Sequence, residues 1–98
     1  MPAPTSKATV ARAGEALRFA GPLLRAQVAE AWRQALPQLV GVRRFDLAQV
    51  PAIDSAGIAL LAELAARAGE TVAVDGPPPE YAALCAAYRL GPALAFVT

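Results

Sequence analysis

Residues 45–64, FDLAQVPAIDSAGIALLAEL, decide the fold, because an apolar strand, a short link and a helix follow one another within them. Phe45 and Leu47 alternate with polar residues, which is the period of a strand with one buried face. After the link, an aspartate and a serine precede an apolar run, and both residue types favour the start of a helix. The stretch therefore predicts a strand over 41–47 and a helix over 55–68.

The residues before this stretch predict a hairpin and a helix. ATVARAGEALRFAG indicates two strands, around 8–12 and 15–20, and Gly14 suits the positive φ of the tight turn between them. We expect a helix to begin at Gly21–Pro22 and to run to about Leu36, because proline is favourable at the first helical position. The polar side of this helix comprises Arg25, Gln27, Glu30, Arg33 and Gln34.

The residues after the stretch continue the alternation of strands and helices. A β-branched run at 71–74 is typical of a strand buried in a parallel sheet. We expect a third helix from Glu80 to about Leu90, and a last strand in ALAFVT, 93–98. The element order predicts an α/β fold in which an N-terminal hairpin joins a largely parallel mixed sheet with three main helices.

Length and composition indicate one domain. The chain has 98 residues, and we expect residues 1–7 to be a flexible lead-in and residues 8–98 to form the domain. Hydrophobic residues make up 56% of the chain, but charges interrupt every apolar run before the length of about 18 residues that spans a bilayer. The N-terminus lacks the residue order of a secretory signal, and Cys85 is the one cysteine. These features favour a cytoplasmic protein without direct membrane insertion.

The charged and catalytic residue types argue against two classes of function. Nine basic and eight acidic residues are scattered along the chain and give a net charge of +1, so we expect no nucleic-acid partner. The chain has no histidine, no glycine-rich phosphate loop and no cysteine cluster, so we expect neither an enzyme nor a cofactor or metal site. Asp46 and Asp54 lack a base or a metal as partner, and we interpret them as loop and cap residues.

The start of the 55–68 helix is the candidate site. The simplest interpretation of Asp54 and Ser55 is a helix cap, which contributes roughly 1 kcal/mol of stability. A helical wheel, however, places Ala56 and Leu60 away from the predicted core, on the side that carries the i,i+4 pair of Glu63 and Arg67. We therefore predict a small protein-docking patch, although a single exposed leucine is also ordinary. The predicted core positions of this helix are Ile58, Leu61, Ala62, Ala65 and Ala68. The predicted partner-binding residues are Asp54, Ser55, Ala56, Gly57, Leu60 and Glu63, with Arg67 completing the pair with Glu63.

The residues of the opening stretch resemble a known family. FDLAQVPAIDSAGIALLAEL is similar to the signature of STAS domains, which occur in anti-sigma-factor antagonists and in accessory subunits of transporters. The shared pattern is an apolar strand ending in Asp-Leu, a short link, Asp-Ser/Thr-x-Gly-Leu/Ile and a leucine-bearing helix. The element order and length agree over nearly the whole chain. The resemblance implies the STAS fold and a protein partner.

One position, Ala56, separates the subgroups of this family. In antagonists that a serine kinase switches, the hydroxyl residue before the glycine takes the phosphate, and alanine offers none. The pattern, with the later YRLGP, more closely resembles the small STAS subunit of the Mla system, an ABC transporter that moves phospholipids between the inner and outer membranes of Gram-negative bacteria. The resemblance implies a non-catalytic subunit on the cytoplasmic ATPase, peripheral to the inner membrane. The alternative is an antagonist that binds an anti-sigma factor or serine kinase.

Overall fold

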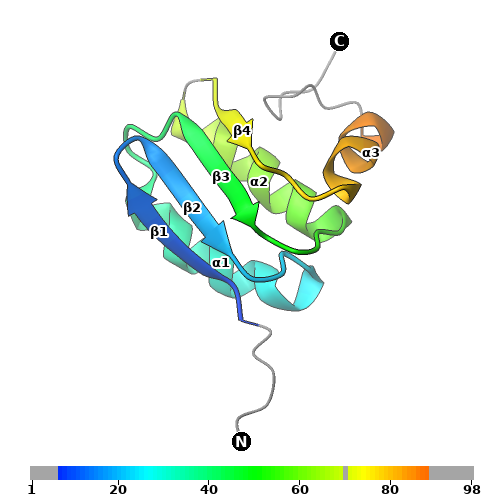
Figure 1. The fold of residues 1–98 in the computed structure, drawn as a ribbon. Helices are drawn as coiled ribbons and strands as arrows, with labels where there is room; N and C mark the ends of the chain where they lie inside the picture. The colour runs from blue at the N-terminus through cyan, green and yellow to red at the C-terminus, as the bar shows by residue number, and fades with distance from the viewer. Residues whose placement is uncertain (1–6, 70, 89–98) are drawn as a thin grey trace, which may run out of the picture.

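The computed structural model describes residues 7–69 and 71–88, and its first elements form the predicted hairpin (Figure 1). Strands β1 (Thr9–Ala13) and β2 (Ala16–Ala20) pair antiparallel. Gly14 has a φ of 62°, so the turn between them uses the left-handed conformation that glycine adopts without strain. The prediction of a hairpin is confirmed.

Within the described residues the sheet contains four strands in the order β1-β2-β3-β4, so the spatial order follows the order along the chain. Strands β3 (Arg44–Gln49) and β4 (Ala73–Asp75) each run parallel to the strand before them. Parallel neighbours need a long crossover, and a helix lies in each of the two connections. The predicted α/β fold with a largely parallel mixed sheet is confirmed.

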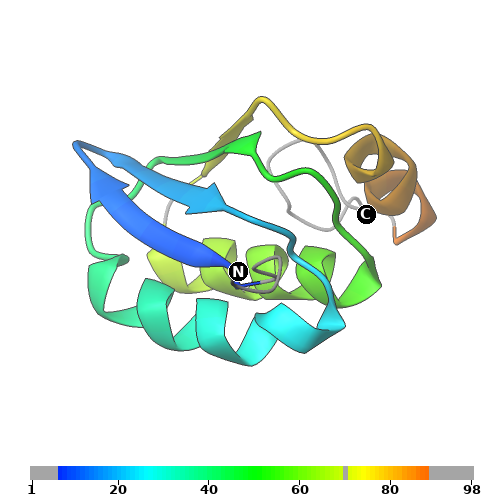
Figure 2. The same cartoon turned by 60° about the horizontal axis from the view of Figure 1, so that its bottom comes forward.

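In the described part of the chain, three α-helices accompany the sheet: α1 (Val28–Ala35), α2 (Ser55–Ala68) and α3 (Glu80–Ala87). Helices α1 and α2 lie side by side under one face of the sheet, and α3 lies beyond the end of β3, near the start of α2 (Figure 2). The bounds of α2 are those predicted. Asp54 caps its start, and Gly69, with a φ of 80°, ends it in the left-handed conformation.

The first helix begins later than the sequence predicts. After β2 the chain stays extended, and the amide of Leu23 donates to the carbonyl oxygen of Ala52 at 2.9 Å. Two short 3-10 turns, η1 (Arg25–Gln27) and η2 (Leu36–Gln38), then flank α1. The expected start at Pro22 is wrong because pairing with the segment that follows β3 overrides the local preference of proline.

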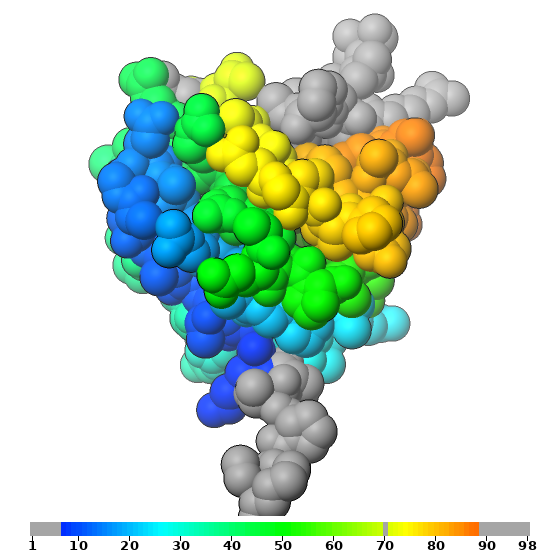
Figure 3. Space-filling view, viewed as in Figure 1, coloured from blue at the N-terminus to red at the C-terminus, as the bar shows by residue number. Residues whose placement is uncertain are grey.

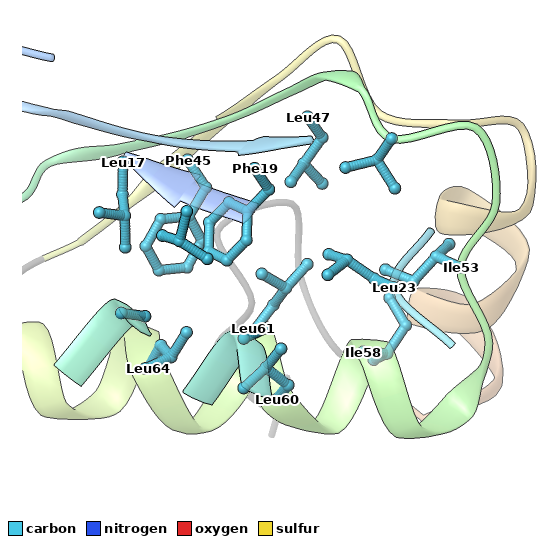
Figure 4. Close-up of a cluster of buried hydrophobic side chains, with 14 of the residues drawn as sticks. Leu17, Phe19, Leu23, Phe45, Leu47, Ile53, Ile58, Leu60, Leu61 and Leu64 are labelled. Atoms are coloured by element: carbon cyan, nitrogen blue, oxygen red, sulfur yellow. The ribbon is translucent and has the colours of Figure 1, made fainter. Parts of the chain in front are cut away.

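The core lies between the sheet and the helices beneath it (Figure 4). Leu17 and Phe19 of β2 and Phe45 and Leu47 of β3 are fully buried, as the alternation of these strands requires. The rings of Phe19 and Phe45 meet edge to face with their centroids 5.5 Å apart. Helix α2 packs onto this layer with Ile58, Leu60, Leu61 and Leu64. The core therefore fixes α2 under the middle of the sheet.

The opposite face of the sheet, which is turned toward the viewer in Figure 3, carries charged side chains. Arg18 pairs with Asp46 at 3.2 Å, and Arg44 pairs with Asp75 at 3.0 Å. Such exposed pairs contribute little stability, but they keep this face hydrated. Asp46, which we expected in a loop, lies within β3 as part of this face.

The predictions for the last third of the chain are only partly covered by the described residues. The strand expected at 71–74 is β4, which begins two residues later. Helix α3 ends at Ala87. The expected helix end near Leu90, the last strand at 93–98 and most of the lead-in lie outside the described residues. Among residues 7–69 and 71–88, no helix has both the length and the apolar character needed to cross a membrane.

Candidate docking site at the start of helix α2

Asp54 joins the starts of two helical segments. One carboxylate oxygen accepts a hydrogen bond from the backbone amide of Gly57, and the other accepts one from the amide of Arg25, each at 3.0 Å. The first bond is the N-cap of α2, and the second holds the first residue of η1. Leu23 and Ile53 form an isolated parallel bridge next to both bonds. One side chain therefore fixes the two segments relative to each other.

The charge of Asp54 is stabilised by these amides. Burial disfavours the ionised carboxylate, but hydrogen bonds from the backbone amides of Gly57, Arg25 and Ala56 outweigh it and hold the pKa of Asp54 below its usual value. A carboxylate at a helix start also meets the positive end of the helix dipole. The interpretation of Asp54 as a cap residue is confirmed, and its oxygens are engaged inside the fold.

Gly57 lies where the first turn of α2 touches the chain after β2. A Cβ atom at this position would collide with the carbonyl oxygen of Leu23 and would lie 2.7 Å from Cγ1 of Ile53. Real Cβ atoms do not approach other atoms so closely. Gly57 is buried, so its contribution to the site is close packing under the helix start rather than contact with a partner.

Ser55 is exposed at the first position of α2. Because Asp54 takes the cap position, the Ser55 hydroxyl makes no hydrogen bond to any of the described residues. The interpretation of Ser55 as a helix cap is wrong, because the Asp54 carboxylate occupies the cap position and accepts the hydrogen bond from the Gly57 amide. The hydroxyl is available to donate to a partner or to accept from it.

Leu60 does not form part of an exposed patch. Its side chain is 3% exposed and belongs to the core. The predicted wheel considered only the contact of α2 with the sheet, whereas α1 covers a second flank of the helix. Arg67, on that flank, lies with its guanidinium carbon 5.0 Å from the centroid of the Trp32 ring of α1. Leu60 is therefore buried because α1 packs beside α2.

The exposed surface of α2 is a narrow stripe along the helix. Ser55, Ala59, Glu63 and Ala66 are exposed, and we call these four residues the α2 outer face. Ala56 is half-buried at its margin. Glu63 pairs with Arg67 at 3.5 Å, as the i,i+4 spacing predicts. Apart from Glu63, the side chains of this face are small, and the face presents one hydroxyl and one carboxylate.

The sequence did not indicate several residues that shape this site. Arg25 and Leu23 enter through backbone contacts, which any residue type can make, so composition gives no signal for them. Ala59 and Ala66 are exposed because the buried stripe of α2 is turned toward Leu60 and Leu64. The i,i+3 and i,i+4 spacing of the glycine and leucines at 57, 60, 61 and 64 indicates this buried stripe, and it would have predicted that Ala59 and Ala66 are exposed.

Comparison with known families gives one match. A family model described as "Mlab, STAS domain" matches residues 8–97, which include all the strands and helices described above. The chain matches none of the curated proteins.

Proposed function

Because the chain belongs to the family of MlaB-type STAS domains, we propose that it is a non-catalytic subunit that binds and supports the ATPase of an ABC transporter. The transporter moves phospholipids between the inner and outer membranes. The subunit lies on the cytoplasmic side and is held at the inner membrane through the ATPase and its permease. Its effect is on assembly and activity of the ATPase, not on chemistry of its own.

The observation that carries this proposal is Ala56. The residue before Gly57 has no hydroxyl, so a kinase cannot phosphorylate it. A phosphate there would add about −1.5 to −2 charges and would release a partner by electrostatic repulsion. A subunit that remains on its partner has no need of such a switch. The match to the MlaB-type family supports the same choice.

The α2 outer face is the surface that we propose for the contact. It combines the free hydroxyl of Ser55 with the small side chains of Ala59 and Ala66. Asp54 and Gly57 position this face from below, and Leu60 holds it onto the core. Of the predicted partner-binding residues, Ser55 and Glu63 are therefore proposed to touch the partner, with Ala56 at the margin.

An affinity pull-down tests the proposal. The tagged full chain is recovered from gently solubilised native cells, and the bound proteins are identified by mass spectrometry. We expect an ABC ATPase together with its permease. Recovery of an anti-sigma factor or a serine kinase without them would contradict the transporter assignment.

Charge-and-size variants locate the surface. Ser55→Arg and Ala59→Arg place a long cation on the α2 outer face, and we expect each to reduce recovery of the ATPase at least tenfold, a loss of about 1.4 kcal/mol of binding. Thr9→Arg is the matched control, because Thr9 is exposed on the opposite side, in the polar face of the sheet. Equal recovery with all three variants would place the contact elsewhere.

One observation favours the alternative of a signalling antagonist. The Ser55 hydroxyl is exposed at a helix start, where a kinase has access to it. A phosphate on Ser55 would lie next to the Asp54 carboxylate, although the helix N-terminus would partly offset that repulsion. Recovery of a serine kinase in the pull-down, with phosphate on Ser55, would support this alternative.

A further inference from the structure

The outward edge of β1 is occupied by side chains. β1 is an edge strand of the sheet, so the backbone groups of alternate residues point away from β2. The amide of Val10 donates to Oε1 of Gln34 at 2.8 Å, and Nε2 of Gln34 donates to the carbonyl oxygen of Ala8 at 3.2 Å. The amide of Arg12 donates to Oε1 of Gln38 at 3.0 Å, and Nε2 of Gln38 donates to the carbonyl oxygen of Val10 at 3.3 Å. Four outward groups between Ala8 and Arg12 are thereby paired.

The spacing of the two glutamines matches the spacing of the strand. Gln34 lies in α1 and Gln38 ends the 3-10 turn η2 that follows it, so the step of four residues between them advances by about 6–8 Å along the helical axis. Alternate residues of a strand are separated by about 6.6–6.8 Å. Glutamines at i and i+4 therefore meet strand residues at i and i+2 in register. Each side-chain amide presents one N–H donor and its oxygen acceptor to the strand, as a backbone peptide group does, and keeps a second N–H for another acceptor.

Further bonds hold the two glutamine side chains in place. Nε2 of Gln38 also donates to the carbonyl oxygen of Gln34 at 2.8 Å, and Nε2 of Gln34 donates to a carboxylate oxygen of Glu30 at 3.2 Å. The Arg12 guanidinium donates to the carbonyl oxygens of Gln38 and Val40 at 2.6 and 2.7 Å. The side chains are therefore ordered before any partner arrives.

We propose that Gln34 and Gln38 act as a substitute strand that closes the β1 edge, and that a domain lacking both amides pairs through β1 with β1 of a second copy. A second copy is the occupant that fits, because two β1 strands related by a twofold axis present the same backbone groups to each other. The outer-face side chains of β1 are Thr9, Ala11 and Ala13, which are small enough not to obstruct such pairing. The wild-type protein then meets its partners through surfaces other than this edge.

Hydrogen exchange followed by NMR tests the closure in the wild-type protein. The amides of Val10 and Arg12 are on an edge, yet we expect them to be protected, because each donates to a glutamine. In Gln34→Ala/Gln38→Ala, we expect these two amides to exchange roughly tenfold faster or more at low protein concentration, where the edge is open to water. Alanine favours the helix, so the variant retains α1.

Sedimentation velocity over a concentration series tests the pairing. We expect the double variant to show concentration-dependent dimers, and Gln49→Ala to sediment as the wild type does. Gln49 is the matched control, because it is an exposed glutamine on β3, which β2 separates from β1. Rapid exchange of the Val10 and Arg12 amides in the wild type would overturn the proposal even if the double variant did not fold. A folded double variant that stays monomeric throughout the series would overturn it as well.

Discussion

Replacement of Asp54 by alanine removes two hydrogen bonds at once. Loss of the N-cap to the Gly57 amide costs about 1 kcal/mol. Loss of the bond to the Arg25 amide adds about 1 kcal/mol, since one further charge-assisted bond disappears. We therefore expect Asp54→Ala to lower the free energy of unfolding by about 2 kcal/mol, which corresponds to a fall of about 1 to 2 M in the urea midpoint.

Asp46→Ala is the matched control for this measurement. Asp46 also accepts two hydrogen bonds, from the amide of Ala48 and from Arg18, but it lies on the hydrated face of the sheet. We expect its replacement to cost less than about 1 kcal/mol. Urea unfolding followed by circular dichroism measures both variants. If Asp54→Ala shifted the midpoint no more than Asp46→Ala, the double-cap reasoning would be refuted.

The contribution of Asp54 also depends on pH. Its pKa in the folded protein lies below the value in the unfolded chain, so the carboxylate stabilises the fold fully above the unfolded pKa. This stability is lost as the pH falls through the folded pKa. The difference between the wild type and Asp54→Ala should therefore be constant above about pH 5 and should shrink toward pH 3. A difference that grew on acidification would have the wrong sign.

Three further substitutions and one mass measurement separate the structural residues of the site from its surface. Leu60→Ala should lower the free energy of unfolding in urea by about 2–5 kcal/mol, as expected for a buried leucine. A loss below about 0.5 kcal/mol would contradict the burial of Leu60. Gly57→Ala should destabilise the protein in the same assay despite the better helix propensity of alanine, because its Cβ meets the Leu23 carbonyl; a stabilised variant would contradict the packing. Ser55→Ala should melt within a few degrees of the wild type, because Asp54 is the cap residue. Intact-mass spectrometry of the native protein should show no stoichiometric phosphate. One phosphate per chain would favour the signalling alternative.

Local signals in the sequence predicted α2 and the hairpin well. The start of α2 is marked by an aspartate that caps and its end by a glycine, and both act through contacts within a few residues. Gly14 likewise determines its turn through its own backbone. The family resemblance rested on the same local motif, and the family match over residues 8–97 confirms it.

The errors have in common that a distant segment decided the outcome. Pro22 does not begin a helix because the neighbouring Leu23 pairs with residues after β3. Leu60 is buried because α1 lies beside α2. Gln34, expected on a solvated helix side, reaches the edge of β1, and Gln27 of the same polar set is 8% exposed. A helical wheel describes one helix alone, so it cannot indicate which flank a neighbour covers.

The sheet order β1-β2-β3-β4 bears on how the chain is produced. Each strand pairs with the strand synthesised just before it, so a nascent chain can add strands to the sheet in the order in which they are synthesised. The hairpin pairing is local and forms quickly, whereas the two parallel pairings join strands separated by a helix and form more slowly. Once α1 has left the ribosome, its glutamine and the one that follows can cover β1 while the other side of the sheet is still growing. New strands are thus added at one side of the sheet. A half-synthesised domain therefore has one free edge through which it can associate with neighbouring chains on a polysome.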